Sequence, residues 1–547
     1  MHPLSRLIAA ALLCVVPLQA ALAERRTVCT ITVNSPDEKN VFRRYLPPDD
    51  YQFVELVEHG RPDWLSSACR AGVHCDVLLI SGHFDDGTQF YSDRPGVREY
   101  LPVEELERAS CSESCPGLFS QLKEVYLFGC NTLNAQALRS TTAEIGRSLA
   151  RAGHAPADIE RLTRLLDEEH ADSNRDRMRQ IFHDVPVIYG FSSKAPLGAS
   201  AGPVLERYFQ NGGTAEIGSG RPSAKLLNLF APVAMTFTAG LAPWEAQAAF
   251  RRDVCAFADD RETAAQKLEF VHRLLGRDMG EVRMFLDRIE HALASLAQAR
   301  DDATQRALDA ITADHTAFSR FMEFARDADQ ASTRARMIEI AHTLRWLSDG
   351  EQRTELVQML SDHLARDAIG PAEVDLACSL DARLALRQDI DALKVPHGRA
   401  SASSFAVLAC LGSSEARARM LQALASTDDR VVQLAQVYLQ HHPITDVLEL
   451  RGVVGAIALM DGSDAQVRAL ETLARLQLSD PDTLQSLARL FPTTRSLSVQ
   501  RAIAGVLIRA DYSALARPEL VRALREHRVK SPGGPDVIDV LIRRLQS

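Results

Sequence analysis

Two apolar runs decide the fold of this chain: Asp76–Phe84 reads DVLLISGHF, and Glu124–Cys130 reads EVYLFGC. Each run is short, rich in aliphatic and aromatic residues and bounded by turn-forming residues, which is typical of a buried β-strand. The first run contains His83 near its end, and the second ends on Cys130. The two runs therefore predict two strands that each lead directly into a chemically reactive side chain.

Further runs of the same kind lie on both sides of these two. They are Thr27–Val33, Tyr51–Val57 and Val185–Ser192. Amphipathic segments separate the runs, at Pro62–Ala71, Pro102–Ala109, Thr142–Ala152 and Ile159–Phe182. Strands that alternate with such crossover segments predict an α/β domain with a mostly parallel sheet covered on both faces. Because ligands bind at the carboxyl ends of strands in these sheets, we expect the functional site there.

The second half of the chain has a different pattern. After about residue 245 the strand signals stop, and apolar residues recur at spacings of three and four, which predicts helices only. Aligning three segments on Val432, Val467 and Val499 gives intervals of 35 and 32 residues, a period typical of stacked helix pairs of the HEAT or armadillo kind. An irregular helical domain is the alternative, because periodicity alone does not separate the two. The glycine- and proline-containing stretch 212–243 is the expected junction. We therefore expect a domain over 24–245 and a HEAT-like helical array over 246–547.

His83 and Cys130 together suggest a catalytic dyad. An imidazole can take the proton of a thiol, and the resulting thiolate attacks a carbonyl carbon. Each residue has a structural alternative, since free cysteines are commonly buried and a lone histidine at a strand end is commonly a hydrogen-bonded structural residue. Their position at the ends of two successive strands favours the dyad.

Several segments around the dyad resemble the caspase-like cysteine peptidases of clan CD. The segments are SGHFDDGTQFYSD (81–93), LPVEELER (101–108), LFGCNT (127–132) and VPVIYGFSSKAPLGASAGPVLERYF (185–209). They resemble, in this order, the histidine strand with its β-hairpin, the helix that follows, the nucleophile strand, and the pocket loop with its helix, as in clostripain-like, CHAT and separase-type peptidases. His83 precedes Cys130 by 47 residues, close to the roughly 50 residues of caspases. The resemblance implies an αβα sandwich and a His83/Cys130 dyad.

The resemblance also implies an oxyanion hole and a substrate pocket. In the family a glycine normally follows the histidine and its backbone N–H helps to stabilise the oxyanion, whereas Phe84 stands here. The amides of Phe84 and Cys130 are the candidate donors, and Gly82 and Gly129 allow tight turns beside them. Ser192 and Ser193 begin the loop that corresponds to the specificity pocket.

The first 23 residues have the pattern of a secretory signal peptide. A basic start at Arg6 is followed by an apolar run and by Ala21-Leu22-Ala23, so we expect cleavage before Glu24 and a periplasmic or secreted protein. Nine cysteines follow this leader, an odd number, and an oxidising compartment favours disulfides. The pairs Cys69/Cys75, Cys111/Cys115 and Cys378/Cys410 are reasonable expectations because their members are close in sequence or share the helical region.

Charge and composition argue against several classes of partner. The chain has 72 acidic and 62 basic residues, for a net charge of −10, so no basic surplus favours nucleic acid. No segment after the leader is apolar enough to predict a membrane span. His74/Cys75 and His170/Asp172 lack companion ligands at zinc-site spacing, so we expect no metal and no cofactor.

These observations predict an exported cysteine endopeptidase that cleaves protein or peptide substrates, with a helical array that binds a substrate or a protein partner. The main alternative is an inactive caspase-like fold that serves as an interaction scaffold, which Phe84 favours. A second alternative is another thiol enzyme, such as an amidase or a transferase.

Overall fold

The computed structural model describes residues 25–546 except 57–64, 85–86, 93–98, 137–145, 148, 151–152, 170–172, 297–300, 367, 394–400, 461–463, 476–477, 512–516 and 531–535. The predicted signal peptide, most of the expected helix at 142–152 and the start of the one at 62–71 therefore lie outside the described residues. The chain forms two compact units, which divide between Gln305 and Arg306. The helices of 246–305 thus belong to the same unit as the sheet.

The first unit is built on a six-stranded sheet with the order β2-β1-β3-β6-β7-β8. The strands are β1 (Arg26–Thr32), β2 (Tyr51–Glu55), β3 (Val77–Ser81), β6 (Glu124–Phe128), β7 (Val187–Phe191) and β8 (Met235–Thr238). The pairs among the first five strands are parallel, and β8 pairs antiparallel with β7. All five predicted strands are confirmed, with slightly tighter bounds. The edge strand β8 was missed, since its sequence MTFT is short and lies in the expected junction.

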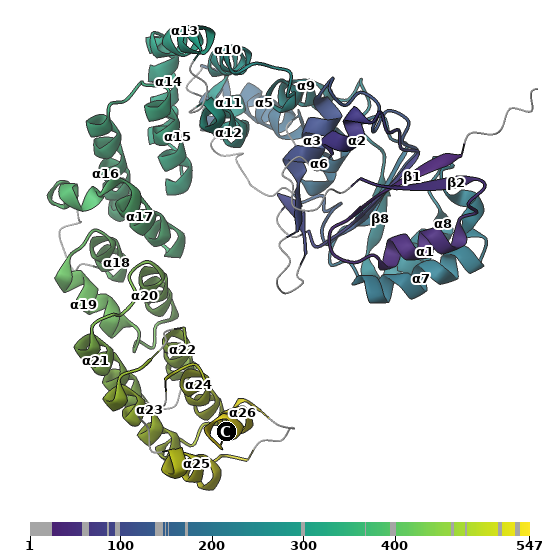
Figure 1. The fold of residues 1–547 in the computed structure, drawn as a ribbon. Helices are drawn as coiled ribbons and strands as arrows, with labels where there is room; N and C mark the ends of the chain where they lie inside the picture. The colour runs from purple at the N-terminus through teal and green to yellow at the C-terminus, as the bar shows by residue number, and fades with distance from the viewer. Residues whose placement is uncertain are drawn as a thin grey trace, which may run out of the picture. The chain divides into compact units, whose positions relative to one another are not determined.

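Helices cover both faces of this sheet (Figure 1). Around the sheet lie α1 (Asp37–Tyr45), α2 (Ser66–Arg70), α3 (Val103–Cys111), α6 (Asn174–Ile181), α7 (Gly198–Gln210) and α8 (Ala224–Phe230). Helix α5 (Pro156–Glu169) lies instead beside one of the later helices, α9 (Gln247–Ala258) (Figure 1). Alternate residues of each buried strand enter different cores: Leu79 packs with α1, α7 and α8, whereas Ile80 packs with α2, α3 and α6. Because side chains alternate along a strand, fully buried parallel strands must be apolar at nearly every position. The mostly parallel α/β architecture is confirmed.

Three disulfides fasten the first unit and one lies in the second. They are Cys29–Cys75, Cys69–Cys115, Cys111–Cys255 and Cys378–Cys410. The predicted pair Cys378/Cys410 is confirmed, while Cys69/Cys75 and Cys111/Cys115 are wrong. Closeness in sequence misled here, because two of the bonds join residues 46 positions apart that the fold brings together. Disulfides of this number are typical of proteins in oxidising compartments.

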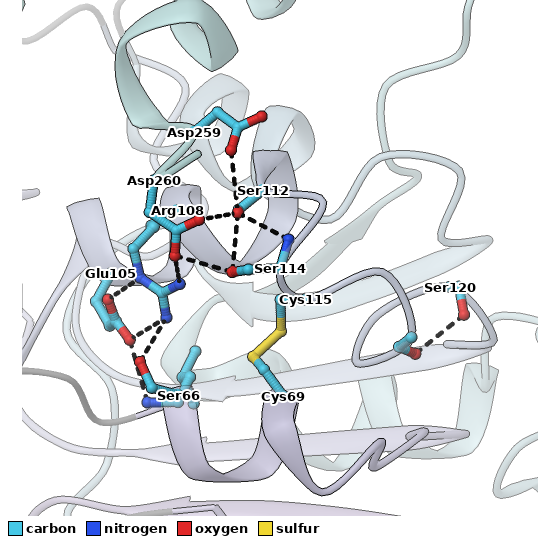
Figure 2. The surroundings of a disulfide bond; sticks show 12 residues. Ser66, Cys69, Glu105, Arg108, Ser112, Ser114, Cys115, Ser120, Asp259 and Asp260 are labelled. Carbon is cyan, nitrogen blue, oxygen red and sulfur yellow. Dashed lines mark hydrogen bonds and ion pairs between the residues drawn. A yellow bond between two sulfur atoms is a disulfide. The ribbon is translucent and has the colours of Figure 1, made fainter. Parts of the chain in front are cut away.

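Polar groups surround the Cys69–Cys115 bond (Figure 2). The Arg108 guanidinium pairs with Glu105 of its own helix and with Asp260, at 2.7 and 2.8 Å. Asp260 follows α9 (Gln247–Ala258), which also carries the disulfide partner of Cys111. A disulfide therefore joins α9 to α3, and an ion pair joins α3 to the residues just after α9.

A buried ion triad joins the sheet domain to another of the later helices. Glu107 of α3 is 3% exposed and accepts hydrogen bonds from Arg177 of α6 and from Arg288 of α12 (Leu286–Leu296). Burial would raise the pKa of Glu107, but the two guanidinium groups outweigh it and hold that pKa at about 2. Helices α10 (Ala264–Leu275) and α11 (Met279–Met284) lie between α9 and α12 in the sequence. The array that the sequence predicts from residue 246 thus starts with helices that are anchored to α3 and α6.

The second unit is entirely helical among its described residues. Its helices are α14 (His315–Arg326), α15 (Ala331–Thr343), α16 (Asp349–Ala365), α17 (Pro371–Leu384), α18 (Ala402–Cys410), α19 (Ser414–Ala423), α20 (Asp429–His441), α21 (Val447–Ala458), α22 (Asp464–Leu473), α23 (Pro481–Thr493), α24 (Leu497–Leu507), α25 (Arg517–Glu526) and α26 (Val537–Gln546), and α13 (Asp302–Thr312) spans the division between the units. Figure 1 shows them stacked one after another. None of the helices in the described part of the chain is both long and apolar enough to cross a bilayer.

The last helices repeat with a period of 34 residues. Buried Ala435, Ala469 and Ile503 occupy the same position of α20, α22 and α24. Two buried glutamines hold equivalent positions, because the Nε2 atoms of Gln466 and Gln500 both donate to the carbonyl nine residues earlier, at 2.8 and 3.3 Å. The residues equivalent to Val432 are therefore Gln466 and Gln500. The predicted alignment used the adjacent valines, Val467 and Val499, and was wrong by one residue in each of these two segments.

Candidate active site

His83 lies just beyond β3, where the chain turns into a hairpin. The backbone N–H of His83 donates to the backbone carbonyl of Tyr91, and the backbone N–H of Tyr91 donates to the carbonyl of His83, both at 2.9 Å. The two rings are 5.4 Å apart between centroids. Tyr91 ends β4 (Gln89–Tyr91), which pairs with β5 (Tyr100–Pro102). Paired backbone on one side and a ring contact therefore fix the position of the imidazole.

Cys130 lies at the equivalent place beyond β6. The register pairs Ser81 with Phe128, so that His83 and Cys130 each follow the paired position by two residues. The next residue, Asn131, has a φ of 59°, and its N–H donates to the carbonyl of Ser193 at 2.8 Å. This left-handed turn, which asparagine tolerates better than most residues, ends the strand abruptly behind the thiol.

Both side chains line one cleft at the carboxyl ends of the strands. Its volume is about 60 Å³, and its lining consists of Asn34, Ser35, Glu38, Ser81, Gly82, His83, Phe128, Gly129, Cys130, Ala195, Pro196, Leu197 and Gly198. A cavity needs roughly 10–15 Å³ to hold one water molecule, so the cleft has room for a few waters or for a small group of a larger ligand. Of the predicted site residues, the structure brings together Gly82, His83, Gly129 and Cys130 here.

The Cys130 thiol has a backbone donor. Its Sγ accepts a hydrogen bond from the N–H of Ala195 at 3.4 Å. This contact fixes the sulfur beside the backbone of the loop that lines the cleft. Cys130 is the free cysteine of the described residues and is half-buried, whereas the other eight described cysteines are in disulfides.

Phe84 lies outside the lining of the cleft. Its side chain is fully buried in the core that contains Ile80, and its ring packs on Phe90 with centroids 4.6 Å apart. A Cβ on Gly129 would lie 2.9 Å from the Cβ of Phe84, so the glycine leaves the space that Phe84 occupies. The residue after the histidine therefore points away from the site.

Ser192 and Ser193 also lie outside the cleft lining, and both are exposed. The N–H of Ser192 donates to the carbonyl of Ala234 at 3.2 Å, and the Ser193 carbonyl accepts from Asn131. The following residues, Ala195–Gly198, line the cleft instead. Among them Leu197 is 62% exposed, which puts an apolar side chain at the rim.

The sequence analysis missed one titratable group of the cleft, Glu38. This residue is in the first turn of α1, is only 2% exposed, and accepts a hydrogen bond from the Ser81 hydroxyl at 3.2 Å. Burial raises the pKa of Glu38 to about 7. Its place shortly after β1 was a usable signal, because carboxyl ends of parallel strands gather at one edge.

Within the part of the chain that the structure describes, no three acidic, histidine or cysteine side chains group as metal ligands. No protein-family model, curated protein or solved structure matches the chain. The site is therefore interpreted from its own geometry.

Proposed function

We propose that the protein is an exported, caspase-like cysteine peptidase in which Cys130 is the nucleophile and His83 is the general acid and base. The observation that carries this proposal is the register of β3 and β6, which gives the two residues equivalent positions on neighbouring strands and a shared cleft. A thiol and an imidazole in that arrangement are the minimum machinery for thiol-based acyl transfer.

The reaction follows from these two groups. The thiol proton passes to an imidazole nitrogen, and the thiolate attacks the peptide carbonyl to form a tetrahedral intermediate. His83 then returns the proton to the leaving amine, and water hydrolyses the thioester of Cys130 with His83 as base. The hydrogen bond from the Ala195 N–H holds the sulfur in place before attack. The carbonyl oxygen that becomes negative needs its own donors, for which the Cys130 and Phe84 amides are the candidates.

Placement outside the cytoplasm agrees with the cysteine chemistry. Four disulfides require an oxidising compartment in most organisms, and the apolar leader supplies a route of export. We therefore place the enzyme in the periplasm or outside the cell. In that compartment the catalytic thiol is the one that stays unpaired.

The helical unit supplies the proposed binding surface for a protein substrate or partner. Stacked helix pairs expose extended surfaces whose residues vary without loss of the core. Ion pairs between successive repeats, such as Arg417–Glu449 and Arg451–Asp480, both at 2.7 Å, tie the stack together along its length. Their 34-residue period fits stacked helix pairs, and the HEAT-like kind stays a prediction from the sequence.

A peptide library digested by the wild-type protein and read by mass spectrometry tests the proposal. The wild type should cleave with a defined preference, and Cys130→Ala and His83→Ala should not. The double variant Cys378→Ala/Cys410→Ala, which removes two sulfurs from the helical unit, should cleave like the wild type. Cleavage that survives Cys130→Ala, or no cleavage by any form, contradicts the proposal.

Alkylation of Cys130 by iodoacetamide, measured beside the peptide digest, distinguishes the alternatives. A wild-type protein whose Cys130 reacts rapidly with iodoacetamide but cleaves no peptide fits an amidase or a transferase. One whose Cys130 reacts like an ordinary thiol fits an inactive scaffold.

A further inference from the structure

A third ionisable group shares the cleft with the proposed dyad. Glu38 comes from the helix after β1, His83 follows β3 and Cys130 follows β6. The strand order across this edge is β1, β3, β6, so the carboxyl, the imidazole and the thiol follow one another in that order. The Ser81 hydroxyl fixes the carboxyl over the end of β3, two residues before His83. Glu38 is therefore on the histidine side of the dyad.

Among the residues that the structure describes, Glu38 is the acidic group that lines this cleft. On its own helix, Asp37 is adjacent and accepts a hydrogen bond from the Ser35 hydroxyl, and Lys39 pairs with Glu55 of β2 at 2.9 Å. From β3 the facing group is the neutral Ser81 hydroxyl. The lining residues before α7 are uncharged, and Lys194 of the same loop is exposed. Within the described part of the chain, the titratable groups that line the cleft are thus Glu38, His83 and Cys130.

We propose that Glu38 is a positioning residue for the dyad, whose carboxylate stabilises the imidazolium that His83 becomes when it takes the proton of Cys130. The inference rests on the proposed dyad. Proton transfer breaks the S–H bond and forms an N–H bond on the imidazole, which leaves a positive ring and a negative sulfur. A carboxylate nearer to the ring than to the sulfur stabilises this pair, because its attraction to the ring exceeds its repulsion of the thiolate.

Ionisation of Glu38 then controls the reactivity of the thiol. Burial raises the pKa of Glu38 to about 7, so the carboxyl gains its charge as the pH rises through neutrality. Below that pH the neutral carboxyl gives the imidazolium no support. The reactivity of Cys130 should therefore rise through neutrality more steeply than one ionisation allows.

The test is the rate at which iodoacetamide alkylates Cys130 in the full chain between pH 5 and 10. Peptide mapping by mass spectrometry identifies the modified thiol, and the other eight described cysteines are in disulfides. In Glu38→Gln we expect the midpoint of the profile to move up by about half a pH unit, which is roughly threefold less thiolate near pH 7. Above about pH 9.5 the variant and the wild type should converge, because there the thiol ionises without help from the imidazole.

Two further variants make the result decisive. Asp37→Asn removes a neighbouring charge that does not line the cleft but raises the pKa of Glu38, so it should move the steep part of the profile slightly to lower pH. Ser81→Ala removes a hydrogen bond that favours the ionised carboxyl, so it should move the steep part of the profile to higher pH. If Glu38→Gln does not fold, Ser81→Ala tests the role of Glu38 in its place.

The outcomes separate this inference from the proposed function. A profile of Glu38→Gln that matches the wild type, or a rate reduced by the same factor at every pH, overturns the role of Glu38 and leaves the dyad intact. A faster rate at neutral pH also overturns it, because the charge would then act mainly on the sulfur. A wild-type thiol that is slow at pH 7 contradicts the dyad itself.

Discussion

Cys130 lies two residues beyond the end of β6, just as His83 lies two residues beyond the end of β3. Their sequence separation of 47 positions equals the register offset of the two strands, which pairs Ser81 with Phe128. An imidazole and a thiol at matched positions of parallel neighbours lie on the same edge of the sheet, and a single cleft contains both. The site is thus a consequence of the pairing between two strands, and changes that disturb that pairing should disturb the site.

The buried ion triad should contribute strongly to the stability of the first unit. Replacing Glu107 by alanine leaves Arg177 and Arg288 with no common carboxylate, so we expect a loss of about 3 to 5 kcal/mol of unfolding free energy. Glu104→Ala removes an exposed partner of Arg177 and should cost at most about 1 kcal/mol. Urea unfolding of both variants measures the difference. Equal losses of unfolding free energy in the two variants would show that the triad stabilises the protein no more than an exposed ion pair does.

The disulfide between α3 and α9 should hold the later helices on the sheet domain. It closes a span of 144 residues, and long spans gain most from a cross-link, so Cys111→Ala/Cys255→Ala should lose about 2 to 4 kcal/mol. Hydrogen exchange followed by mass spectrometry should show faster exchange in α9 but not in α20. Faster exchange confined to the second unit would contradict this assignment.

Two glycines should respond in opposite ways to alanine. In Gly129→Ala the new Cβ meets the Cβ of Phe84 at 2.9 Å, so we expect a loss of about 1 to 3 kcal/mol together with slower alkylation of Cys130. In Gly455→Ala, within α21, no atom lies within 4 Å of the new Cβ, and the higher helix propensity of alanine should add about 1 kcal/mol. Urea unfolding and the alkylation rate test the pair together. A stable, fully reactive Gly129→Ala protein would refute the crowding described here.

The helical unit should lose stability in mild acid because of His363. This side chain is 2% exposed in α16, and neither ring nitrogen has a hydrogen-bond partner among the residues that the structure describes. Burial, followed by the charge of Arg366, lowers its pKa in the folded protein, so the unfolded chain binds a proton at a pH where the folded chain does not. Stability is therefore complete above the unfolded pKa and falls as the pH drops below about 6.5, by about 1 kcal/mol per pH unit.

The variant His363→Leu isolates this contribution. Other histidines, including His183 and His442, also have lowered pKa values, so the comparison must be made against the wild type at each pH. The difference in unfolding free energy between the two proteins should change between pH 7 and pH 5.5. A constant difference would remove His363 as the cause.

Much of the first unit could be predicted from the sequence because buried parallel strands leave a strong local signal. The runs that contain β3 and β6 are apolar throughout and lead into polar residues, so both the strands and the positions of His83 and Cys130 followed. The signal for Glu38 was weaker, because only its place shortly after β1 marks it and a glutamate in the first turn of a helix is ordinary. Its burial depends on the contact with Ser81, which only the fold creates.

Pairings between distant residues were the part that local patterns did not determine. Cys29 bonds to Cys75 and Cys69 to Cys115 because the sheet brings these segments together, and nothing in the spacing of the cysteines specifies it. The repeat register failed for a related reason. The alignment matched the valine beside each buried glutamine. The equivalent buried positions are Gln466 and Gln500, whose side-chain amides donate to carbonyls at the end of the preceding helix.

The activation of Cys130 by His83 is the central claim, and one comparison of alkylation rates tests it directly. At pH 6.5, iodoacetamide should modify Cys130 of the wild type about tenfold or more faster than Cys130 of His83→Ala, and the two rates should converge above about pH 9.5. Equal rates in the two proteins at pH 6.5 would contradict the account, because the imidazole would then have no part in ionising the thiol.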